Sequence, residues 1–197
     1  MQWNLPGTVL FTRRETEGDG EQMLRAMFLG GDITLAQVAA ITGLEPHTVQ
    51  NWVKRGFLTP PVHKRYTIDQ LCRIIHINML RGVFSLERTC GLLGYINGQL
   101  DDRSDDIIGD ADLYFMFISL ASRAQQLTRP EACERILAEM LRDYSEPYPG
   151  AKERVSNALK VMLTAYLAAQ MRSSADAILA ELEENAKCLK NKEITTK

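Results

Sequence analysis

The chain has 197 residues, 45% of them hydrophobic, and a formal net charge of −2, so its length and apolar content suit a folded core. No stretch approaches the roughly 20 apolar residues of a membrane-spanning helix, and the first residues (MQWNLPGTVLFTRRETEGDGEQ) lack the apolar centre of a signal peptide. We therefore expect a cytoplasmic protein with no membrane partner.

The N-terminal segment, residues 1–31, begins apolar and then becomes polar. Trp3, Leu5 and Leu10 precede the polar run, and a short helix is predicted from about Glu21 to Leu29. The front of the segment is too apolar for a disordered tail. We expect it to dock on the domain that follows or on a partner subunit.

Residues 34–66 (TLAQVAAITGLEPHTVQNWVKRGFLTPPVHKRY) predict two short helices joined by a tight turn. Thr34 can accept hydrogen bonds from the free N–H groups of the first helix, and Gly43 ends that helix in a left-handed conformation. Pro46 suits the first turn of the second helix because its missing N–H is not needed there. Together with the basic hairpin that follows, this pattern is typical of a winged helix-turn-helix.

The second helix, expected over residues 46–55, carries a polar stripe opposite the apolar Val49 and Trp52. The stripe consists of His47, Gln50, Asn51 and Lys54, at positions i, i+3, i+4 and i+7. Amides can pair with adenine and basic side chains with guanine or phosphate, and no member of the stripe is acidic. From Pro46 to Gly82, six basic residues stand against one acidic residue, so we expect double-stranded DNA as the partner.

A short wing is expected over residues 57–66. Phe57–Leu58 and His63–Tyr66 would form its two strands, and the prolines between them exclude a helix. Lys64 and Arg65 are then placed to hold phosphates. A merely solvated basic face is the alternative, which the combination of turn pattern and polar stripe disfavours.

Two more helices complete a domain over residues 32–99. Thr67 with Gln70 fits a capping box that opens one helix, and Ser85 caps another from Leu86 to about Leu93. The two helices are amphipathic, so we expect them to pack on each other.

An acidic linker is predicted at residues 100–112, which include six aspartates. Carboxylate-rich loops can bind calcium, but DDRSDDIIGD lacks the EF-hand spacing. We expect a solvated segment that repels duplex DNA and binds no metal.

The C-terminal domain, residues 113–197, is predicted to be all-α. Its helices are expected at 113–127, 130–144, 151–171 and 174–190, and the last two are either separate or continuous. We expect this domain to dimerise or to sense an effector. Dimerisation is favoured because symmetric DNA reading needs two modules about 34–36 Å apart.

An apolar face on the third of these helices is the predicted interface of a homodimer. Its residues are Val155, Leu159, Met162, Leu163 and Tyr166. The alternative is that these side chains form an intramolecular core, which is the more common fate of amphipathic helices of this length.

An aromatic cluster suggests a pocket for a small apolar effector. Its residues are Tyr114, Phe115, Met116, Phe117, Tyr144 and Tyr148. Aromatic and methionine side chains at helical spacing more often belong to the core, so core packing is the alternative.

Common catalytic and metal-binding signatures do not occur in the sequence. There is no G-x-S-x-G, no G-x-x-x-x-G-K-[ST], no G-x-G-x-x-G and no H-E-x-x-H, so we expect no enzymatic activity. The cysteines form no C-x-x-C pair and no zinc-type cluster with histidine, so we expect buried thiols and no cofactor. The cysteines are Cys72, Cys90, Cys133 and Cys188.

The run TVQNWVKRGFLTPPVHKRYTIDQLCRIIHINMLRGVFSLE resembles the domain-of-unknown-function family 1836, and ITGLEPHTVQNWVKRGFLTPP with KRYTIDQL resembles the DNA-binding domain of MerR-type regulators. These resemblances imply a mainly α fold with an N-terminal MerR-like winged helix-turn-helix, and a cytoplasmic transcription regulator. The DNA-binding residues that they imply are His47, Thr48, Gln50, Asn51, Lys54 and Arg55 on the recognition helix and Lys64, Arg65 and Tyr66 on the wing.

One departure from the MerR pattern bears on mechanism. Gln50, Asn51 and Trp52 stand where that family has an arginine and two tyrosines, and the wing is shorter. Repression by occupancy is therefore as compatible with the sequence as promoter distortion. The alternative function is a protein–protein adaptor that uses the C-terminal helices while its winged helix no longer binds DNA.

Overall fold

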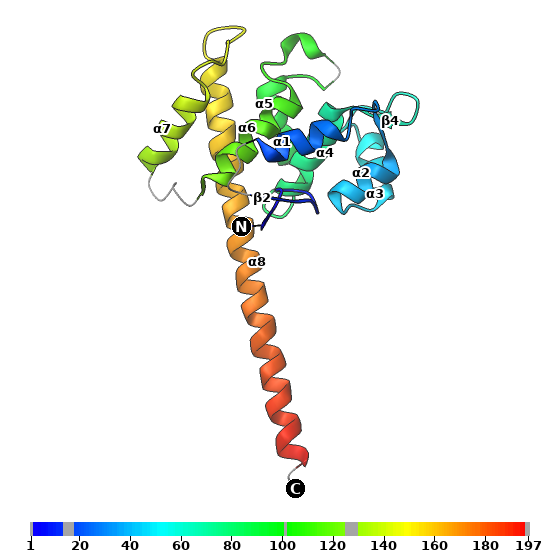
Figure 1. Cartoon of the computed structure of the whole chain (residues 1–197), viewed down its shortest axis with the longest axis vertical. Coiled ribbons are helices and arrows are strands. Elements are labelled where there is room, and N and C mark those ends of the chain that lie inside the picture. Colours follow the sequence, from blue (N-terminus) through cyan, green and yellow to red (C-terminus); the bar gives the residue numbers. More distant parts are fainter. Residues whose placement is uncertain (1, 14–17, 101, 125–129, 196–197) are drawn as a thin grey trace.

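The computed structural model describes residues 2–13, 18–100, 102–124 and 130–195. These residues form a mainly α structure, as predicted, with two small two-stranded antiparallel sheets (Figure 1). The helices are α1 (Asp19–Ala26), α2 (Leu35–Thr42), α3 (Pro46–Lys54), α4 (Ile68–Leu80), α5 (Leu86–Asn97), α6 (Asp110–Ser122), α7 (Pro130–Met140) and α8 (Ala151–Thr195). The strands are β1 (Gln2–Asn4), β2 (Phe11–Arg13), β3 (Ile33–Thr34) and β4 (Arg65–Tyr66), and β1 pairs with β2 while β3 pairs with β4.

Helix α4 lies at the centre of the molecule. It begins with the predicted capping box, in which the Thr67 hydroxyl accepts from the Gln70 N–H and the Gln70 side chain accepts from the Thr67 N–H. Most of its side chains are buried, and Leu71, Ile74 and Leu80 are fully so. Helix α4 packs against α2, which precedes it in the chain, and against α5, α6 and α8, which follow it. Elements from before and after α4 therefore belong to one hydrophobic core.

The expectation of a solvated linker at residues 100–112 is wrong for its second half. Ile107 and Ile108 are buried, and α6 begins at Asp110. Asp69 of α4 accepts a hydrogen bond from the Ala111 N–H (3.1 Å), which satisfies a free donor of the first turn of α6. Apolar side chains between the aspartates therefore anchor this segment on α4, whereas the division of the chain into domains stays a prediction.

Helices α6 and α7 end earlier than expected. Helix α6 ends at Ser122, and the predicted end at Leu127 lies outside the described residues. Helix α7 ends at Met140 rather than Tyr144, and residues 141–143 form a turn.

The N-terminal segment docks on the chain's own core, which was one of the two expectations. The Tyr114 hydroxyl of α6 donates to the Pro6 carbonyl (2.8 Å). Asn78 of α4 donates to the carbonyls of both Gly7 and Thr42, so one side chain joins the N-terminal hairpin to the end of α2. Leu5 between these contacts is fully buried.

Helix α8 is continuous, so the two helices expected at 151–171 and 174–190 are one helix. It runs through Ser173 and Ser174, and the Ser174 hydroxyl donates to the Gln170 carbonyl (3.0 Å). The first half packs against the other helices, and the second half projects away from the globule to the C-terminus (Figure 1).

The predicted dimer face belongs to the intramolecular core. Its five residues are at most 8% exposed in the single chain: Val155, Leu159, Met162, Leu163 and Tyr166. These side chains pack beneath α4, α5 and α6, so they are not available to a second copy, and the alternative of a bundle core is the one observed.

Candidate functional site

The turn between α2 and α3 is formed by the residues that the sequence singled out. Thr34 caps α2 in a capping box with Gln37, and Gly43 ends the helix with φ 68° in the left-handed region. Helix α3 then starts at Pro46. Val49 and Trp52 are buried beneath it, which fixes the rotation of α3 about its own axis.

The opposite face of α3 carries the polar stripe and is exposed to solvent. All four of its side chains are exposed: His47, Gln50, Asn51 and Lys54. Thr48 beside them is partly buried. The buried Val49 and Trp52 therefore hold four non-acidic polar side chains on one outward face of a short helix.

Arg55, at the end of α3, has partners within the chain. Its guanidinium lies 2.8 Å from the Glu87 carboxylate of α5 and 4.7 Å from the centre of the Phe57 ring. It remains about half exposed, at 54%. A partner that binds Arg55 therefore competes with Glu87.

The hairpin differs from the predicted wing in its strand pairing. Residues 57–58 are not a strand, because Gly56 turns the chain with φ 75° and the Phe57 N–H donates back to the Trp52 carbonyl. The partner of β4 is β3, with Tyr66 opposite Ile33 and a further bridge between Val62 and Arg65.

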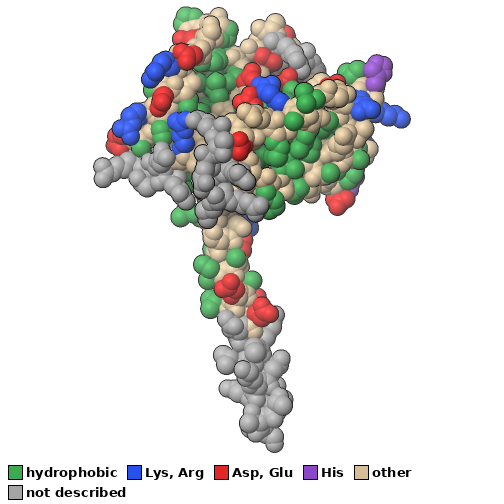
Figure 2. All heavy atoms as spheres, viewed as in Figure 1, with side chains coloured by type: hydrophobic (Ala, Val, Ile, Leu, Met, Phe, Trp, Pro, Cys, Tyr) green, Lys and Arg blue, Asp and Glu red, His purple; other side chains and the backbone are tan. Residues whose placement is uncertain are grey.

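A tight two-residue turn presents the basic tip of this hairpin. His63 (φ 50°) and Lys64 (φ 62°) occupy the left-handed region, and the Arg65 N–H donates to the Val62 carbonyl (2.8 Å). His63, Lys64 and Arg65 are exposed. Basic and histidine side chains gather at the edge of the molecule where β4 lies (Figure 2).

Two residues of the predicted wing are held by the chain itself. Arg65 donates to the Asp32 carbonyl (2.9 Å), so its guanidinium is anchored at the surface. Tyr66 is only 3% exposed, and it packs in the core because its strand pairs with β3. Contact between the Tyr66 side chain and DNA stays a prediction, which this burial disfavours.

Helix α4 clamps the loop that links α3 to the hairpin. The Gln70 amide donates to the carbonyls of Thr59 and Pro60 (both 3.1 Å) and to the Thr59 hydroxyl (3.0 Å). Arg73 donates to the Phe57 carbonyl (3.3 Å). Neither residue was predicted for the site, because both stand on a helix that reads as core.

Arg73 also joins this loop to α6. Its guanidinium lies 3.3 Å from the Asp110 carboxylate, and both side chains are largely buried (9% and 14% exposed). Burial raises the pKa of Asp110 to about 6, while Arg73 acts in the opposite direction. Arg73 of α4 therefore connects the loop after α3, through its hydrogen bond to Phe57, with the start of α6, through its ion pair with Asp110.

His76 lies fully buried beside this pair. Its ring meets the Tyr114 ring edge-on, with the centroids 5.6 Å apart, and neither ring nitrogen has a hydrogen-bond partner among the described residues. Desolvation, together with the charge of Arg73, lowers the pKa of His76 to about 3. The imidazole is therefore neutral at pH 7.

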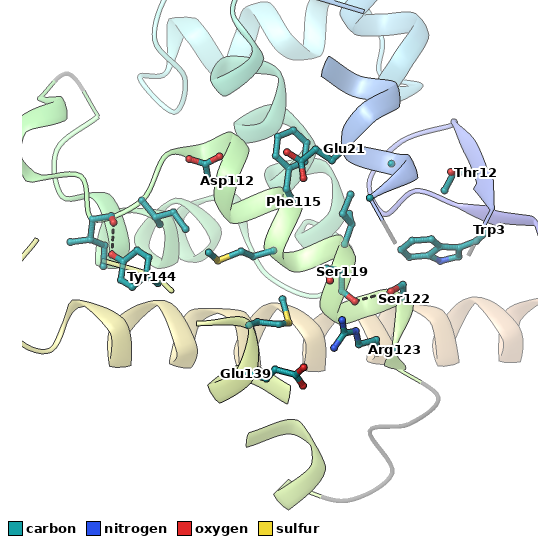
Figure 3. A pocket seen from close by; sticks show the side chains of 17 residues that line it. Trp3, Thr12, Glu21, Asp112, Phe115, Ser119, Ser122, Arg123, Glu139 and Tyr144 are labelled. Atoms are coloured by element: carbon teal, nitrogen blue, oxygen red, sulfur yellow. Dashed lines mark hydrogen bonds between the residues drawn. The ribbon is translucent and has the colours of Figure 1, made fainter. Parts of the chain in front are cut away.

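A cavity of about 700 Å³ lies between α6, α7 and the N-terminal hairpin (Figure 3). Three residues of the predicted effector cluster line it: Phe115, Met116 and Tyr144. Tyr114 and Phe117 are instead fully buried in the core, and Tyr148 lies away from the cavity with its hydroxyl against Arg154. Trp3 and Arg123 also line the cavity, and neither belonged to the predicted cluster.

The described cysteines are separate thiols. Cys72 is buried, and Cys90 and Cys133 are partly buried; burial raises the pKa of each. The side chain of Cys188 lies outside the described residues. Within the described ranges, no three His, Cys, Asp or Glu side chains come together to hold a metal ion, and no helix has both the length and the apolar content needed to cross a membrane.

Comparison with known proteins gives one family match, "Domain of unknown function (DUF1836)", over residues 33–117. The match covers less than half of the chain. The match begins at β3 and ends within α6, so it includes the α3 stripe, the hairpin and the Arg73–Asp110 contact. This confirms the resemblance to family 1836 that the sequence suggested.

A relative is found in Bacillus subtilis (strain 168), where the similar protein is named "Uncharacterized protein YkrK". The two sequences are 28% identical over 86 residues, which is 42% of this chain and 37% of that protein. The chain thus matches little more than a third of the relative's length. No solved structure matches the chain at a significant level.

Proposed function

We propose that this protein is a sequence-specific transcription regulator that binds double-stranded DNA through a MerR-like winged helix-turn-helix. Helix α3 enters the major groove, and the tip of the hairpin rests on the phosphate backbone. The protein acts in the cytoplasm and is not an enzyme. Target sequence and sign of regulation are left open.

The exposed stripe on α3 is the observation that carries this proposal. His47, Gln50, Asn51 and Lys54 are exposed while Val49 and Trp52 anchor the helix from beneath. Amide and basic side chains suit base edges and phosphates, and a rigid helix presents them without a further ordering cost. The basic hairpin tip supports the same interpretation.

A homodimer is part of the proposal, with the interface on the projecting half of α8. Met171, Ala175, Ile178 and Leu182 repeat at spacings of four, three and four, which is typical of a coiled-coil seam. Met171, Ile178 and Leu182 are 60–76% exposed in the single chain. A second copy would cover this seam and bring two DNA-binding modules together, as symmetric DNA reading requires.

The test is fluorescence anisotropy with random-sequence duplex DNA across a salt series. We expect binding that weakens steeply with salt, and a slope reduced by about 1 in Lys64→Ala because one phosphate contact is lost. Arg142→Ala is the matched control, since Arg142 is an exposed basic residue in the turn after α7.

Specificity is tested on sequences selected from a random pool. Asn51→Ala should weaken binding to the selected site by about 1–3 kcal/mol and leave binding to random duplex nearly unchanged. Absence of binding by the wild type even at low salt would overturn the DNA proposal and favour the adaptor function, with α8 as the bait for a partner.

A further inference from the structure

We propose that the cavity between α6, α7 and the N-terminal hairpin binds a small organic cation with an apolar or aromatic body. Its volume of about 700 Å³ lies within the range of about 300–1,000 Å³ that is usual for small-ligand sites. The binding does not depend on the proposed DNA-binding activity, because the cavity is built from other residues.

The walls of the cavity are suited to an apolar body. Ile108, Met116, Ile118 and Met140 contribute aliphatic and thioether surface. Trp3 and Tyr144 lie at opposite ends of the cavity (Figure 3). The Tyr144 hydroxyl donates to the Ile107 carbonyl (2.5 Å), which fixes the orientation of its ring. A ring-containing ligand therefore meets aromatic side chains on preformed supports.

The charges of the cavity favour a cation. Three carboxylates line it, those of Glu21, Asp112 and Glu139, against one guanidinium, that of Arg123. The carboxylates come from α1, α6 and α7, so they approach the cavity from different elements. Arg25 lies at the rim beside Glu21 and Asp112, so three carboxylates face two guanidinium groups in all, and the remaining net charge of −1 favours a cation over an anion.

At the rim of the cavity, Arg25 of the chain itself occupies a site for a cation. Its guanidinium lies 4.6 Å from the centre of the Phe115 ring, 2.7 Å from Glu21 and 3.6 Å from Asp112. A cation held over an aromatic face between two carboxylates is the arrangement that recognises organic amines. Here Arg25 balances Glu21 and Asp112 from outside the cavity lining.

Glu139 is the carboxylate left for a ligand. It is exposed on α7, and its side chain has no hydrogen-bond or ion-pair partner in the described part of the chain. Glu139 stands across the cavity from Asp112 and Phe115 (Figure 3). A ligand that lies along α6 brings its positive group to Glu139 while its body contacts Met116 and Met140.

A matched ligand series tests this assignment on the full-length protein. The probes are phenylbutylamine, phenylbutanol and phenylbutyrate, which share one body and carry a positive, no and a negative charge at neutral pH. Trp3 reports binding by its fluorescence in a Trp52→Phe variant, since the chain has two tryptophans. Titration calorimetry on the wild type gives the affinities independently of that variant.

We expect phenylbutylamine to bind at least about tenfold more tightly than phenylbutanol, with phenylbutyrate weakest. Glu139→Gln should reduce the affinity for the amine by about fivefold to tenfold and leave the affinity for the alcohol unchanged. Glu131→Gln, a carboxylate on the same helix outside the cavity, should change neither affinity.

Three results would overturn the proposal. They are binding of none of the probes at millimolar concentration, equal or tighter binding of the alcohol or the acid, and the same effect of Glu139→Gln and Glu131→Gln on the amine. Circular dichroism of each variant confirms that the helices are retained. These measurements contain no DNA, so a negative result would overturn the ligand site without affecting the proposed DNA-binding function. A negative result in the DNA-binding test would likewise leave the ligand site unaffected.

Discussion

His76 is fully buried, yet both of its ring nitrogens lack a hydrogen-bond partner among the described residues. Only the neutral imidazole tolerates such a site, which is why its pKa falls to about 3. Asp110, whose carboxylate lies 4.0 Å from the His76 ring and 3.3 Å from the Arg73 guanidinium, has a pKa raised to about 6 by the same desolvation. These two residues make opposite contributions to stability as the pH falls.

The sign follows from the direction of each shift. The lowered pKa of His76 contributes stability that is present above its unfolded value of 6.5 and is lost as the pH falls toward about 3. The raised pKa of Asp110 contributes stability that is present below its unfolded value of 3.8 and is lost as the pH rises through about 6.

We therefore expect His76→Phe to gain stability relative to the wild type on acidification. The free energy of unfolding of the variant relative to the wild type should rise by about 2–3 kcal/mol between pH 7 and pH 4.5. The reason is that His76 becomes protonated in the unfolded chain over this range but stays neutral in the folded one. Urea unfolding at the two pH values measures it. His47→Phe on the exposed face of α3 is the control, and an equal change in both variants would contradict the prediction.

At the scale of elements, the turn between α2 and α3 depends on a left-handed glycine. Gly43 has φ 68°, and a Cβ at this position would lie 2.7 Å from a methyl carbon of Val9 in the N-terminal hairpin. Gly56, at the end of α3, has φ 75° but open space around it. At both positions an L-amino acid would strain the backbone, but the space around them differs.

This difference predicts the outcome of two alanine substitutions. Gly56→Ala should reduce the free energy of unfolding by about 1–2 kcal/mol, because a left-handed alanine is strained. Gly43→Ala should cost more, since it must also displace Val9 and disturb the hydrogen bond from the Val9 N–H to the Ile41 carbonyl. Chemical unfolding of both variants measures the loss in free energy of unfolding. Equal losses would contradict the prediction, because they would mean that the N-terminal hairpin moves aside at no energetic cost.

The capping signals on these elements were readable from sequence, whereas the strand pairing was not. Thr34 and Thr67 cap their helices through residues three positions away, which is local information. Strand β4 instead pairs with β3, more than 30 residues earlier, and this buries Tyr66. Nothing within residues 57–66 distinguishes that pairing from a self-contained hairpin.

At the scale of the whole molecule, α8 has two different halves. Its 45 residues span roughly 65–70 Å, far more than the globule needs. The first half is buried against other helices, and the second half carries hydrophobic and acidic side chains on an isolated stem (Figure 2). A lone helix with an exposed apolar seam is marginal in water, so a partner helix is expected.

The proposed homodimer predicts a change of mass with substitution. Sedimentation analysis should give the wild type a mass of about twice that of the single chain, which is 22.2 kDa. The Ile178→Asp/Leu182→Asp variant should have the mass of a monomer, with the helix content of the globule unchanged. Ala180→Asp adds one charge away from the seam and should leave the dimer intact. A monomeric wild type at micromolar concentration would contradict the assignment.

The sequence by itself determined what depends on neighbouring residues: the helix starts, the glycine turns, the exposed stripe on α3 and the mainly α class. The tertiary structure decided what depends on distant contacts. It buried Val155 and Leu159 while leaving Ile178 exposed, although all three lie on one helix with similar apolar residues. It also packed α6 on α4 through Arg73 and Asp110. The physical reason is that periodicity predicts an apolar face, whereas only the fold determines which surface covers it.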